Sequence, residues 1–94
     1  MKYKALKESL EAQGRGKMKV FGHSMEPIIA SGTLLEFQVK ATYEVGDVVF
    51  CKVRGRYIDA HKIIKKAPGG RYLIANNKGW ENGWTSQVYA AVVL

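Results

Sequence analysis

The sequence predicts a small, mostly β protein with one helix at its N-terminus. Hydrophobic residues recur at helical spacing only between Lys2 and Gln13, whereas from Lys17 onward they alternate with polar residues. The chain also holds ten glycines against two prolines, which is typical of many tight turns. These observations favour a small curled antiparallel sheet or partly open barrel.

The N-terminal helix is predicted over Lys2 to Gln13. Tyr3, Leu6 and Leu10 form a narrow apolar stripe, and Gly14 supplies the stop signal. A chain of 94 residues is too short for two ordinary domains. We therefore expect a helix and linker over residues 1–16 and one β domain over residues 17–94.

Six strands are expected, each rich in β-branched or aromatic residues and bounded by Gly, Pro or Asn. Arg54 and Gly55 are expected at the tip of a hairpin. Trp80 and Trp84 are expected to be buried over the open end of the core. The strands are Lys17 to Phe21, Thr33 to Lys40, Asp47 to Val53, Arg56 to Ile64, Arg71 to Ala75 and Gln87 to Leu94.

Composition narrows the range of functions. The single cysteine, Cys51, lies in an apolar run, which indicates a buried thiol and a reducing, cytoplasmic compartment. No apolar run is long enough to span a bilayer. The net charge of +7 comes from dispersed residues, so nucleic acid is not the expected partner. The chain ends on an apolar strand, residues 90–94, and the sequence leaves open whether a charged tail follows it.

Ser24 lies where a reactive hydroxyl is expected. Gly22 permits unusual backbone dihedrals before it, and Pro27 restricts the chain after it. A serine becomes nucleophilic only when a base takes its proton and nearby donors stabilise the oxyanion. The backbone N–H groups of Ser24 and His23 are candidates for those donors.

His61 is the candidate base, because the side chain of His23, adjacent to Ser24, is expected to point elsewhere. Strict alternation along the fourth strand would place Asp59 and His61 on one face. Asp59 is therefore a candidate to orient the imidazole of His61, although residues two apart on a strand are distant for a direct bond.

Three segments together resemble a known superfamily. They are residues 22–27 (GHSMEP) followed by Gly32, residues 46–49 (GDVV) and residues 60–63 (AHKI). Their order and spacing are similar to the serine peptidases that join LexA-like and phage repressor peptidase domains to type I signal peptidases, over about residues 18–94. The resemblance implies a LexA-like β fold, a nucleophile at Ser24 and a general base at His61. The base is a lysine in LexA-like members, and Lys62 could serve only through a register change or bulge.

One element of the resemblance is missing. Members that use histidine generally carry an aspartate in a later Gly-Asp-Asn-like segment, whereas residues 75–80 here read ANNKGW. Asn76 or Asn77 could orient His61 through its side-chain carbonyl; the alternative is an ordinary turn.

The sequence thus predicts a serine endopeptidase-like domain that hydrolyses peptide bonds in proteins or peptides with a Ser24–His61 dyad, without metal or cofactor. A peptidase-fold interaction or dimerisation module without catalysis, for example a phage regulatory protein acting as a homodimer, is the alternative. A basic nucleic-acid-binding β domain is the third hypothesis.

Overall fold

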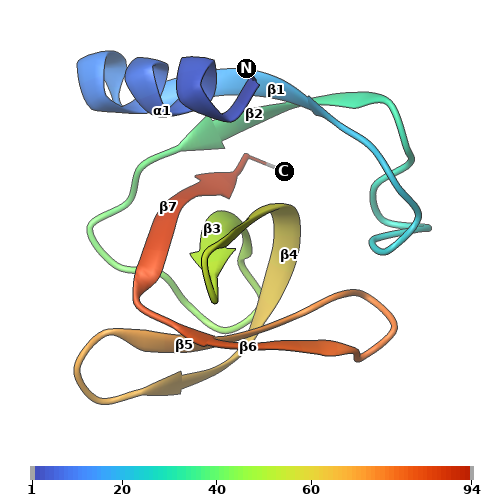
Figure 1. The fold of residues 1–94 in the computed structure, drawn as a ribbon, viewed down its shortest axis with the longest axis vertical. Coiled ribbons are helices and arrows are strands. Elements are labelled where there is room, and N and C mark those ends of the chain that lie inside the picture. The colour runs from blue at the N-terminus through green and yellow to red at the C-terminus, as the bar shows by residue number, and fades with distance from the viewer. Residues whose placement is uncertain (1, 94) are drawn as a thin grey trace.

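The computed structural model describes residues 2–93 and confirms a mostly β protein with one helix. All strand pairs are antiparallel, and they form one open sheet in the order β1-β2-β7-β3-β4-β5-β6. Figure 1 shows α1, β1 and β2 at one end of the molecule and β5 and β6 at the other. The elements are α1 (Lys2–Gln13), β1 (Arg15–Val20), β2 (Thr33–Gln38), β3 (Val48–Val53), β4 (Arg56–Ala67), β5 (Arg71–Ala75), β6 (Glu81–Thr85) and β7 (Gln87–Val92).

The strands differ from expectation in three main places, and in addition β2 ends at Gln38 and not at Lys40. β1 begins at Arg15, inside the segment expected to be a linker, and pairs with β2 from that residue onward. β4 continues to Ala67. β6 was not predicted, because Asn82 and Gly83 within it read as turn residues. It pairs with β5, and Gly83 adopts a φ of 130° beside Val53 and Arg54.

The helix α1 packs directly on β1 through its narrow apolar stripe. Leu6 and Leu10 are buried, and the N–H of Gly14 donates to the carbonyl of Leu10 to close the last turn. A Cβ atom on Gly16 would lie 2.8 Å from Leu6 Cδ1 and 2.9 Å from Ser9 Cβ. Glycine at position 16 therefore permits the close approach of helix and strand.

The core lies on both faces of β3, the most buried strand. Phe50 belongs to the cluster beneath α1, whereas Val49 and Cys51 belong to a second cluster on the opposite face. Tyr3 and Tyr57 stack on Phe50, with ring centroids 5.9 and 5.7 Å away. Burial raises the pKa of Cys51 to about 12, which agrees with the buried thiol inferred from the sequence.

The tryptophans are not in the core. The exposed fractions of Trp80 and Trp84 are 76% and 42%, so the expectation that they are buried over the core was wrong. Tyr43 and apolar residues of β3, β4, β5 and β7 form the second cluster instead. Trp84 lies against the guanidinium of Arg71.

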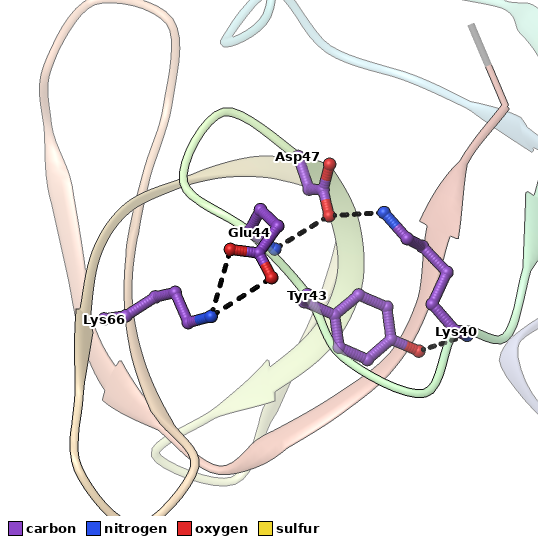
Figure 2. A network of polar contacts seen from close by, with 5 residues as sticks. All are labelled: Lys40, Tyr43, Glu44, Asp47 and Lys66. Carbon is purple, nitrogen blue, oxygen red and sulfur yellow. Dashed lines mark hydrogen bonds and ion pairs between the residues drawn. The ribbon is translucent and has the colours of Figure 1, made fainter.

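The turn before β3 fastens this strand to β4. The N–H of Gly46 donates to the carbonyl of Ile63, and the N–H of Ile63 donates to the carbonyl of Asp47. Figure 2 shows the polar network around the turn, in which Asp47 accepts from Lys40 Nζ at 2.9 Å and from the N–H of Glu44 at 3.0 Å. The two backbone bonds of Ile63 hold β4 in place two residues beyond His61. The network comprises Lys40, Tyr43, Glu44, Asp47 and Lys66.

Within residues 2–93, no helix is long and apolar enough to cross a membrane.

Candidate functional site

Ser24 lies in an anchored turn between β1 and β2. The N–H of Gly22 donates to Ser31 Oγ at 3.0 Å, and Gly22 adopts a φ of 108°, which favours glycine. Two apolar side chains after the serine, Met25 and Ile29, are buried in the core. These core contacts fix the turn, while Ser24 itself stays half-buried.

Asn77, in the loop between β5 and β6 at the other end of the sheet, forms hydrogen bonds to the backbone of this turn. Its N–H donates to the carbonyl of Ser24 at 2.9 Å, and its Nδ2 donates to the carbonyl of Glu26 at 3.0 Å. Its Oδ1 accepts a bond from Lys62 Nζ at 3.2 Å. The sequence singled out Asn77 as a partner for His61; the structure places it against the backbone of the serine turn.

Ser24 and His61 meet across 37 positions of the sequence. Ser24 Oγ lies 3.0 Å from His61 Nε2, within hydrogen-bond reach. His61 comes from β4, next to a bulge: Val49 of β3 pairs with His61 and Cys51 pairs with Ile58, so β4 carries one extra residue between the two pairs. The bulge breaks the strict alternation that the sequence argument assumed for Asp59 and His61.

The second ring nitrogen of His61 faces Asn82, a residue that the sequence argument missed. Nδ1 of His61 lies 2.7 Å from Asn82 Oδ1. An amide oxygen only accepts, so this bond assigns the proton to Nδ1 and leaves the Nε2 lone pair for the hydroxyl of Ser24. The sequence did indicate that an asparagine after β5 could orient His61. Asn82 was not considered because it lies in β6, a strand that the sequence did not predict.

The other candidates have separate partners. Asp59 accepts bonds from Lys2 Nζ at 2.7 Å and from the hydroxyl of Tyr3, both on α1. His23 is exposed and pairs with Glu26 through Nδ1 at 2.8 Å. Neither side chain is engaged with His61 in the described part of the chain, and the lysine beside His61, Lys62, contacts Asn77.

The family was tested by comparison with known proteins. The model of the family described as Peptidase S24-like matches residues 2–89, nearly the whole chain. The chain belongs to this family. The match is to the LexA-like peptidases that the three sequence segments resemble, and it includes α1 as well as the β domain. No curated protein and no solved structure matched.

A cleft opens beside the serine of this S24-like domain. It measures about 380 Å³ and lies between the first turn of α1, the end of β1 and the bulged part of β4. Ser24 and His61 line the cleft, together with Lys2 and Tyr3 of α1 and Asp59 of β4. Partial burial, together with the hydrogen bond to Asp59, raises the pKa of Tyr3 to about 12.

Proposed function

We propose that this S24-like domain is a serine endopeptidase in which Ser24 is the nucleophile and His61 the general base. The observation that carries the proposal is one continuous chain of contacts, Ser24 Oγ to His61 Nε2 at 3.0 Å and His61 Nδ1 to Asn82 Oδ1 at 2.7 Å. A nucleophile, a base and a group that orients the base are the three parts of the catalytic arrangement of serine peptidases.

The first half of the reaction follows from this geometry. Ser24 Oγ forms a bond to the substrate carbonyl carbon while its proton passes to His61 Nε2. The negative charge on the carbonyl oxygen is stabilised by the backbone N–H groups of His23 and Ser24, which donate to no other described residue. His61 then gives its proton to the amine as the carbon–nitrogen bond breaks, leaving an acyl-enzyme.

The second half uses the same groups. His61 takes a proton from water, the hydroxide oxygen bonds to the acyl carbon, and the proton returns to Ser24 Oγ as the ester breaks. Asn82 keeps the imidazole oriented in both halves. The peptide binds as an added strand through main-chain bonds, which the position of β1 at an edge of the sheet, beside the cleft, supports.

The test is cleavage of a diverse unstructured peptide pool, with products mapped by mass spectrometry. We expect cuts that disappear in Ser24→Ala and His61→Ala and persist in Ser86→Ala, a matched control at an exposed serine in the turn between β6 and β7. The cleavage rate should rise as a histidine base loses its proton, which a pH series from about 6 to 9 covers. Cuts that survive Ser24→Ala, or that depend on Lys62 and not on His61, would refute the proposal.

The competing function is a peptidase-fold interaction module without catalysis. One observation favours it: the orienting partner of His61 is a neutral amide, which stabilises an imidazolium less than a carboxylate does. An active-site-directed phosphonate distinguishes the two functions. Labelling of Ser24 that increases as histidine deprotonates supports the peptidase, whereas no labelling at any pH from about 6 to 9 supports the module.

A further inference from the structure

The sheet carries a second group of side chains, around Trp84 of β6, that does not line the cleft beside Ser24. Trp84 pairs with Leu73 of β5, and Leu73 pairs with Lys65 of β4. Residues paired across antiparallel strands share a face, so these three side chains lie side by side across three strands. Ile74, the neighbour of Leu73, belongs to the second core cluster, so the group around Trp84 lies on the opposite face of the sheet.

An arginine lies against the indole of Trp84. Arg71, at the first position of β5, is two residues before Leu73 and therefore on the same face. Its guanidinium carbon lies 5.5 Å from the centre of the Trp84 ring, while 42% of Trp84 stays exposed. A guanidinium and an indole that lie together form a cationic surface, and nucleic-acid bases stack on both of these groups.

Two further cations lie near Trp84. Lys65 is two strands away on the same face, which at the usual strand spacing is about 10 Å. A Cβ atom on Gly83 would lie 3.4 Å from Nε and 3.6 Å from Nη2 of Arg54, so this guanidinium lies against β6 next to Trp84. Within residues 2–93, Arg54, Lys65 and Arg71 form no ion pair with a carboxylate. Their charges are therefore available to an anionic partner.

These cations are far apart in the sequence, which is why no nucleic-acid site was expected from it. Arg54 comes from the turn between β3 and β4, Lys65 from the second half of β4 and Arg71 from the start of β5. Antiparallel pairing brings the three together around Trp84. The net charge of +7 adds a long-range attraction for polyanions.

We propose that the surface around Trp84 binds single-stranded nucleic acid. This Trp84 surface comprises Arg54, Lys65, Arg71 and Trp84. An unpaired base stacks on the exposed part of the indole, and the three cations contact phosphates of the neighbouring nucleotides. The inference does not rest on the proposed peptidase function, because no member of the Trp84 surface lines the cleft beside Ser24.

A single strand matches this surface better than other anionic partners do. In a duplex the bases are stacked on one another, so the indole would have no base to contact. An acidic side chain would pair with the cations but has no flat ring to stack on Trp84. A tryptophan that anchors a protein to a membrane places its ring among the lipid headgroups, whereas the ring of Trp84 lies against Arg71 on a strand.

Fluorescence tests both the contact and the affinity. The contact is read from quenching of Trp84 in a Trp80→Phe protein, because the chain has only two tryptophans and Trp80 lies outside the Trp84 surface. The affinity is read from the anisotropy of a fluorescein-labelled oligothymidylate of about 12 nucleotides, a length typical of single-strand sites. We expect quenching, and an affinity that falls about 20-fold between about 50 and 200 mM salt for three contacted phosphates.

Three substitutions separate stacking from charge. Trp84→Leu keeps an apolar side chain on this face and removes the ring, so we expect about tenfold weaker binding with the same salt dependence. Arg71→Gln removes one phosphate contact, so the loss of affinity over the same salt range should fall to about sevenfold. Lys4→Gln removes the same charge from an exposed position of α1, and this control should bind like the wild type.

Undiminished binding by Trp84→Leu, or an equal effect of Arg71→Gln and Lys4→Gln, would overturn the Trp84 surface. Absence of Trp84 quenching would do the same. A duplex of equal length, polyglutamate and phosphatidylserine vesicles are the competing partners, and tighter binding of any of them would refute the proposal. Circular dichroism checks the fold of each variant. Should Trp84→Leu not fold, the quenching and the Arg71→Gln comparison decide the outcome, because both keep the tryptophan.

Discussion

At the scale of single residues, Asn82 decides which nitrogen of His61 faces the hydroxyl of Ser24. Its amide oxygen accepts from Nδ1, and this leaves Nε2 as the acceptor for Ser24. A carboxylate in the same place would hold the same tautomer and also stabilise the imidazolium. The bond to Asn82 therefore fixes the ring orientation of His61 without placing a negative charge beside it.

Two substitutions of Asn82 separate orientation from charge. Asn82→Ala removes the acceptor, and we expect kcat to fall by about 10–100-fold with little change in KM, because only the alignment of the base is lost. Asn82→Asp should retain activity and move the acidic limb of the pH–rate profile to higher pH, since a negative charge favours the protonated imidazole. Equal kcat in wild type and Asn82→Ala would contradict the role of Asn82.

Asn77 contacts the turn that carries Ser24 rather than the ring of His61. Its side-chain N–H holds the carbonyl of Glu26, and its backbone N–H holds that of Ser24. In Asn77→Ala the side-chain bond is lost, and we expect the free energy of unfolding to fall by about 1–2 kcal/mol. The rate of Ser24 labelling by a phosphonate should fall with it. Urea unfolding and labelling kinetics on the same sample measure both, and unaltered labelling would show that the turn holds without this bond.

At the scale of elements, the close approach of α1 to β1 depends on Gly16. A methyl group there would meet Leu6 and Ser9 at less than 3.0 Å, so Gly16→Ala must push the helix outward. We expect a loss of about 1–3 kcal/mol of stability by urea unfolding. Lys17→Ala, at the exposed neighbouring position of β1, is the control. A Gly16→Ala protein as stable as this control would mean that α1 adjusts without cost.

Most elements could be predicted because their signals are local. The apolar stripe that ends at Gly14 predicted the full length of α1. The alternating pattern bounded by turn residues predicted the observed bounds of β5. The Arg54–Gly55 turn, with φ values of 51° and 80°, is also as expected. β6 was missed because Asn82 and Gly83 have turn propensity, yet Gly83 pairs with Ile74 of β5 and Asn82 lies at a register shift between two paired residues.

The site could be predicted only in part, for the same reason. Ser24 and His61 carry signals in their own segments, and the structure brings them together. The partners of His61 and of Asp59 are set by the bulge in β4 and by the pairing of β6, which arise from tertiary contacts. Asn82 and the contacts of Asp59 with α1 were therefore beyond the reach of the local pattern.

At the scale of the whole molecule, stability should depend on pH through Asp47. Partial burial alone would raise the pKa of this carboxyl, but the N–H of Glu44 and the ammonium of Lys40 hold the pKa below its usual value. A depressed pKa contributes stability above the unfolded value of about 3.9, and this contribution is lost as pH falls through the folded pKa.

We therefore expect Asp47→Asn to be less stable than the wild type at pH 7, by about 1 kcal/mol for a partly exposed carboxylate. The difference should shrink as the pH falls below about 4, because the carboxyl becomes protonated first in the unfolded and then in the folded protein. Thermal or urea unfolding of both proteins at a series of pH values measures this. A difference that is constant from pH 7 to pH 3 would exclude Asp47 as its source.

The bond between the N–H of Asn77 and the carbonyl of Ser24 joins a loop beside one edge strand, β6, to a turn beside the other, β1. Each time this junction separates, that amide proton becomes free to exchange with deuterium from the solvent. Its exchange rate counts how often the serine turn leaves its place, with no substrate or inhibitor present. One resonance would thus report the fraction of molecules in which the serine turn is joined to this loop.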